Sequence, residues 1–140
     1  MDDSGRRRWL VAAILVGMFY LAVGLTSAAL AGAAASERMV FTWRLSAFIA
    51  SGLAFAAHMG YERFGLRNTA WPTAWHTAAA VAIGGFALAL AANIHDLGSA
   101  SGYRPRMLIA LVAWPLLTAV PAFVVALVVA AGIGVKRARG

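Results

Sequence analysis

The sequence contains no cysteine in its 140 residues and few charged residues. Without thiols the chain cannot form disulfides, thiolate metal sites or cysteine nucleophiles. Charged residues make up only 12% of the chain, whereas hydrophobic residues make up 62%. A soluble domain has enough polar residues to cover its surface, and this composition does not provide them. The sequence therefore predicts an integral membrane protein.

Acidic residues are the scarcer charged type, with five Asp and Glu against twelve Lys and Arg and a net charge of +7. In a soluble protein this excess would suggest a nucleic-acid partner. Here the basic residues lie at the ends of apolar segments, where they orient the chain and contact anionic lipid headgroups. We therefore predict membrane lipids, other membrane subunits or further copies of this chain as partners, and no nucleic acid.

Catalytic motifs are missing as well. The chain has no P-loop, dinucleotide-binding glycine fingerprint, nucleophile elbow or zincin motif. The clearest loop, about residues 97–106, is far too short to be a soluble domain. We predict that the protein is not an enzyme, and that it has no catalytic residues and no metal site.

Four apolar segments are long enough to cross a bilayer, which takes about 20 residues as a helix. They cover about residues 9–35, 39–61, 73–94 and 107–135 of a single membrane domain, 1–140. Short polar breaks make sequential helices neighbours. The predicted fold is an all-α integral membrane protein, with four transmembrane helices in an antiparallel up-down bundle.

The first segment also has features of a signal peptide, namely a basic start and small residues at 31–36 that resemble a cleavage site. The apolar region of a signal peptide has about 7–15 residues, and this run is longer. We therefore interpret it as a membrane span.

Basic residues are distributed unequally between the two ends of the spans. The N-terminus, the 62–72 loop and the C-terminus carry Arg6, Arg7, Arg8, Arg63, Arg67, Lys136, Arg137 and Arg139, and the opposite side carries Arg38, Arg44, Arg104 and Arg106. Because basic segments stay in the cytoplasm, we expect both termini there. The composition, rich in alanine and arginine, suggests a high-GC bacterial genome and hence the inner membrane.

The second span carries a polar stripe. Arg44, Ser51, His58 and Glu62 fall on one helical face, because their spacings of seven, seven and four residues are close to whole numbers of helical turns. Polar groups at membrane depth are costly unless they face protein or water, so the stripe should face the interior. His58 and Glu62 are one turn apart and form a candidate proton or ion site; the alternative is an end-of-helix hydrogen bond at headgroup level.

His58 and His76 lie at similar depth on either side of the 62–72 loop. Two histidines on facing helices are the arrangement that ligates a b-type haem in a bundle, with Arg63 and Arg67 near its propionates. The alternative is that both histidines are interfacial and hydrogen-bonded to backbone or water. We predict no resident cofactor, and haem b at His58 and His76 is the alternative.

Asn93, His95 and Asp96 form a second polar cluster, on the extracytoplasmic side of the third span. We expect Asn93 to hydrogen-bond another helix. Arg44 lies near the same membrane face and either extends toward the headgroups or pairs with Asp96. With no fourth ligand, the cluster does not predict a metal site.

Small residues predict where helices approach each other closely. Gly17, Gly24, Ala28 and Gly32 follow spacings of seven and four, and residues 84–85 place two glycines near the centre of the third span.

These patterns favour an interaction protein, either an accessory subunit of a larger membrane assembly or a self-associating one. The first alternative is a small oligomeric transporter or channel that uses the polar stripe. The second alternative is haem-based electron transfer.

Overall fold

The computed structural model describes residues 3–98 and 107–138, and all of its regular elements are helical. The long helices are α1 (Asp3–Gly32), α2 (Glu37–Gly60), α3 (Ala70–Leu97) and α4 (Met107–Ala138). A π-helical turn, η1 (Tyr61–Gly65), follows α2 directly. Each of the four long helices is long and apolar enough to cross a membrane, and the described residues include no strand. The prediction of an all-helical fold with four helices able to cross a membrane is thereby confirmed.

Three predicted features lie partly or wholly outside the described residues. They are the 97–106 loop beyond residue 98, the arginines at positions 104 and 106, and Arg139. The other predicted site residues all lie within the described chain.

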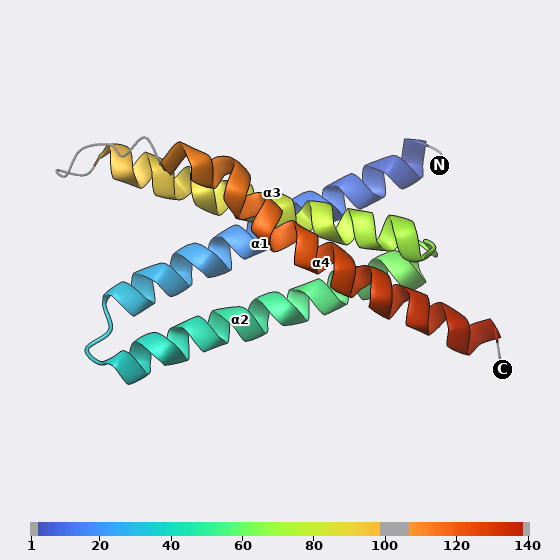
Figure 1. Ribbon diagram of the computed structural model, residues 1–140, viewed down its shortest axis with the longest axis horizontal. Helices are drawn as coiled ribbons and strands as arrows, with labels where there is room; N and C mark the ends of the chain where they lie inside the picture. Colours follow the sequence, from blue (N-terminus) through green and yellow to red (C-terminus); the bar gives the residue numbers. More distant parts are fainter. Residues whose placement is uncertain (1–2, 99–106, 139–140) are drawn as a thin grey trace.

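Helix α3 lies between α1 and α4 and contributes most of the buried residues (Figure 1). Helix α2 packs mainly against α1 and diverges from α3 toward the turn that joins α1 to α2. The ends marked N and C lie at the same side of Figure 1. The core is therefore built around α3, and α2 lies at its margin.

Glycines make the contact between α1 and α3 close. A Cβ atom on Gly17 or Gly24 would lie 2.6 Å from a side chain of α3, and one on Gly84 would lie 2.7 Å from Tyr20 of α1. At these distances the neighbouring atom would have to shift. At Gly84 the neighbours include the Gly17 backbone carbonyl at 3.1 Å, so there glycine lets the two backbones approach closely. The predicted packing role is confirmed for these glycines, whereas Gly32 faces open space.

The contact between α3 and α4 combines a glycine with a polar bond. A Cβ atom on Gly85 would lie 2.9 Å from Thr118 Oγ1 and 3.4 Å from Pro115 Cα. Nearer the other end of α3, the buried Asn93 amide donates hydrogen bonds of 2.9 Å to the Met107 carbonyl of α4 and to a carbonyl of its own helix. Asn93 thus joins two helices, as the sequence predicts.

Helix α2 begins with the cap that its sequence favours. Ser36 has an extended backbone, and its hydroxyl accepts a hydrogen bond of 3.3 Å from the Met39 amide. Glu37 lies in the first turn, where its negative charge suits the helix dipole. The α1–α2 turn is therefore fixed by local sequence.

Candidate functional site

The site forms where α2 gives way to α3, and its backbone is irregular there. The π-helical turn η1 ends as the Leu66 amide donates to the Tyr61 carbonyl over 2.9 Å. Arg67 then adopts a left-handed conformation with φ of 54°, which reverses the chain before Ala70 begins α3. Single π-helical turns occur frequently at functional sites, because they shift side chains away from ordinary helical register. Here the shifted segment contains Glu62.

Glu62 is fully buried and lies at the centre of a polar cluster. Its Oε2 atom accepts a hydrogen bond of 2.6 Å from Asn68 Nδ2 and lies 2.7 Å from His76 Nδ1. The backbone N–H of Asn68 also donates a hydrogen bond of 3.1 Å to the Glu62 backbone carbonyl. We call Glu62, Asn68, His76 and His58 the junction cluster. It joins the end of α2, the following loop and the first turns of α3.

His58 approaches the same carboxylate from α2. Only 3% of the residue is exposed, and its Nε2 atom lies 4.0 Å from Glu62 Oε1. This distance is too long for a hydrogen bond, and neither atom has a hydrogen-bond partner among the described residues. Buried polar groups are usually hydrogen-bonded, so this pair is a candidate functional site. The His58–Glu62 pair can exchange a proton or accept a further polar group.

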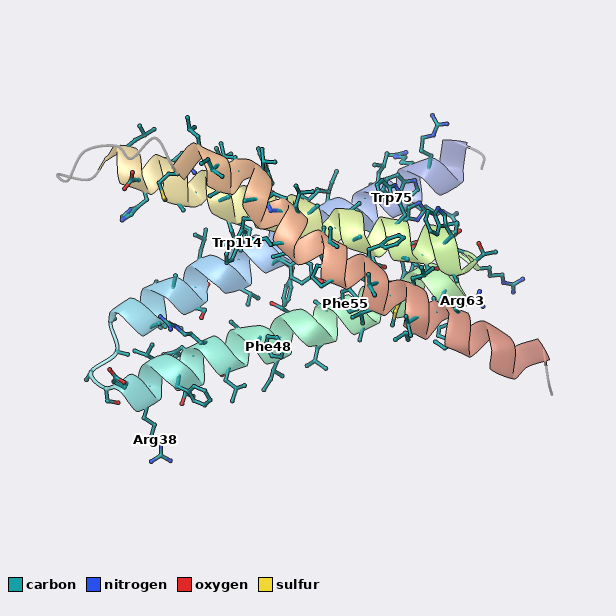
Figure 2. All side chains as sticks on the ribbon, viewed as in Figure 1. Arg38, Phe48, Phe55, Arg63, Trp75 and Trp114 are labelled. Carbon is teal, nitrogen blue, oxygen red and sulfur yellow. The ribbon has the colours of Figure 1, made fainter. Side chains whose placement is uncertain are left out.

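Helix α1 covers the junction cluster with an aromatic ring. The indole of Trp9 stacks on the imidazole of His76 with parallel rings whose centroids are 4.2 Å apart. Arg63 Nη1 donates a hydrogen bond of 2.8 Å to the Asn68 carbonyl, which holds the loop in place. Figure 2 shows Arg63 and Trp75 at this end of the molecule. The junction cluster is thus in contact with α1 as well as with α2 and α3.

The buried face of α3 adds two hydroxyl groups beside the cluster. Thr73 and Thr77 are fully buried, and their Oγ1 atoms have no hydrogen-bond partner among the described residues. Their four-residue spacing, with His76 between them, is a helical pattern that the sequence analysis did not single out. Trp9 and Asn68 were missed too, because one comes from a distant helix and the other from a loop.

The structure brings together only one end of the predicted stripe. His58 and Glu62 meet in the junction cluster. Ser51 is half-buried and Arg44 is exposed, further along α2. Arg44 lines a cavity of about 540 Å³ at the α1–α2 turn. Phe48 is 77% exposed, so the first half of this face is not covered by the chain itself.

The two histidines of the haem prediction face one carboxylate. His76 Nδ1 is bonded to Glu62 Oε2, and His58 Nε2 lies nearest to Glu62 Oε1. A carboxyl group therefore occupies the space between the imidazoles. Haem ligation by His58 and His76 stays a prediction that an absorption spectrum tests.

The extracytoplasmic residues do not share one environment. Asn93 is buried against α4, His95 is exposed and Asp96 is half-buried. Within residues 3–98 and 107–138, no group of three His, Asp or Glu side chains could hold a metal ion. The ion pairs found between described residues both involve Glu62.

Comparisons with protein-family models, with curated proteins and with solved structures found no match.

Proposed function

We propose that this chain is a small multi-pass subunit of a bacterial inner membrane that acts by associating with other transmembrane segments. Its four spans form an antiparallel up-down bundle with both termini in the cytoplasm. The excess of basic residues at the N-terminus and in the 62–72 loop supports this orientation. The partner is another membrane subunit or a second copy of the chain.

The observation that carries the proposal is a strip of small residues on α2. Gly52, Ala56 and Gly60 follow one another at four-residue spacing, and a Cβ atom on either glycine would meet nothing within 4 Å. In membranes this spacing is typical of helix–helix contacts, because small residues let a second backbone approach. Inside the fold, close neighbours of this kind are found at Gly17 and Gly24 of α1 and at Gly84 and Gly85 of α3. Those of α2 are unused, and a helix from outside the chain supplies the missing contact.

Native mass spectrometry and cross-linking in mild detergent test the association. We expect the purified protein to form a defined complex, and Gly52→Ile to abolish it while the helical content is kept. Gly132→Ile is the matched control, because Gly132 of α4 also faces open space. A wild-type protein that is monomeric and has no partner would refute the proposal.

The junction cluster favours a second candidate, a small transporter or channel that moves protons or cations. A fully buried ionisable residue at the end of a membrane span is a functional-site hypothesis by default, and its partners here are His58 and His76. In proteoliposomes, we expect a proton flux that Glu62→Gln and His58→Ala each reduce. Glu37→Gln is the control, because Glu37 is exposed in the first turn of α2. Flux that is unchanged in both cluster variants would argue against transport.

A further inference from the structure

A cavity of about 680 Å³ lies between the first half of α1 and the end of α2. This volume is within the range of about 300–1,000 Å³ that is typical of small-molecule sites. The walls include Arg7, Arg8, Val11, Leu15, His58 and Tyr61. The cavity is separate from the small-residue strip of α2, whose Gly52 and Ala56 do not line it.

The charged side of the cavity is positive. Arg7 and Arg8 are exposed at its rim, and the described residues that line it include no acidic side chain. Neither arginine forms an ion pair with a residue whose side chain the structure describes, a set that begins at residue 5. A guanidinium group binds phosphate or carboxylate oxygens through paired hydrogen bonds, so the rim suits an acidic headgroup.

The deeper end of the cavity along α1 is apolar. Val11 and Leu15 follow Arg7 and Arg8 along the same face of α1, at the spacing of successive helical turns. Leu15 is 65% exposed, although it lies about 10 Å deeper along the helix than Arg8. The cavity thus changes from cationic to apolar along the direction in which a lipid stands in a leaflet.

His58 also lines the cavity, but its Nε2 atom is buried and lies 4.0 Å from Glu62 Oε1. The polar contacts to an occupant therefore come from Arg7 and Arg8.

We propose that this cavity binds one anionic phospholipid of the surrounding leaflet. Arg7 and Arg8 hold the phosphate, and Val11 and Leu15 contact an acyl chain. Soluble phosphate esters carry the same phosphate group and could also contact Arg7 and Arg8. The apolar side chains of Val11 and Leu15 favour a phospholipid over such esters, because only the lipid has an acyl chain.

Native mass spectrometry with defined lipids tests the site. The protein is reconstituted in nanodiscs that contain phosphatidylcholine and phosphatidylglycerol. It is then released from the nanodiscs in the mass spectrometer with increasing collision energy, and the lipids that stay bound are identified by mass. We expect the wild-type protein to retain one phosphatidylglycerol, and the double variant Arg7→Gln and Arg8→Gln to retain about tenfold less. Leu15→Trp fills the apolar end and should also lower retention. Soluble glycerol phosphate in millimolar excess should not displace the lipid.

Arg6→Gln is the matched control. Arg6 is exposed next to the two rim arginines but does not line the cavity. A general attraction between basic residues and anionic lipid would weaken equally in Arg6→Gln, and this result would overturn the proposal. Equal retention of phosphatidylcholine and phosphatidylglycerol would overturn it too. A photo-crosslinker at Leu15 that captures a polypeptide instead of a lipid would assign the cavity to a protein partner.

Discussion

Helices α2 and α3 are both long and apolar enough to cross a membrane, but α3 is far more buried in the fold than α2. Ten residues of α3 are buried, and most of them are Ala, Gly or Thr. In α2 only His58 is buried, and large residues such as Phe48 and Leu53 are exposed. The length and apolar character that define a span therefore do not decide whether it belongs to the core. Small residues that meet a neighbour decide that, because in lipid close packing rather than hydrophobicity holds helices together.

The largest effect is expected where α2 and α3 do meet, at Glu62. Glu62→Ala removes the acceptor of the Asn68 amide and the partner of His76, so we expect the free energy of unfolding to fall by about 3–5 kcal/mol. Glu62→Gln keeps one side-chain acceptor and should lose less than Glu62→Ala. Unfolding by SDS in mixed micelles, followed by tryptophan fluorescence, measures both. If Glu62→Ala is as stable as the wild type, the junction cluster does not join the two helices.

The next largest effect on stability is expected at Gly84 of α3, and Gly52 of α2 is its counterpart. Gly84→Leu places a side chain 2.7 Å from Tyr20 Cβ and 3.1 Å from the Gly17 carbonyl, so α1 and α3 must separate. Overpacking of this kind costs about 1–3 kcal/mol of unfolding free energy. The leucine side chain of Gly52→Leu would extend into open space, so the unfolding free energy should change by less than about 0.5 kcal/mol. If both variants lose the same unfolding free energy, α3 and α2 do not differ in how closely their glycines are packed within the chain.

A smaller effect is expected at the other end of α3. Asn93→Leu removes the hydrogen bond to the Met107 carbonyl of α4 and should lower the unfolding free energy by about 0.5–1.5 kcal/mol. His95→Leu is the control, because His95 is exposed two residues away. The same SDS titration compares them, and a larger loss for His95→Leu would contradict the assignment of Asn93 as the link to α4.

Local sequence was enough to predict what depends on local structure. The proximity of His58 and Glu62 follows from their four-residue spacing. The four spans follow from length and composition.

The rest depends on how each helix is rotated, and no spacing in a single chain gives that. Asn68 reaches Glu62 because Arg67 adopts a left-handed conformation, and Trp9 covers His76 because α1 crosses α3. Glycines show the same limit. Gly17 contacts α3 and Gly52 contacts nothing, although both are glycines within an apolar run of the sequence.

The smallest effect is expected at Phe48, on the part of α2 that diverges from α3 and α4 (Figure 2). Replacing a core phenylalanine by alanine costs about 3–5 kcal/mol, because a cavity remains. Phe48 is 77% exposed, so in Phe48→Ala lipid or detergent fills the space, and the unfolding free energy should change by less than about 0.5 kcal/mol. A loss of more than about 1 kcal/mol in a monomeric sample would mean that α2 closes against α3 or α4 within one chain. A loss seen only in the associated form, and abolished by Gly52→Ile, would instead place Phe48 under a partner. The same substitution thus separates an α2 that faces lipid from an α2 that completes its packing with another subunit.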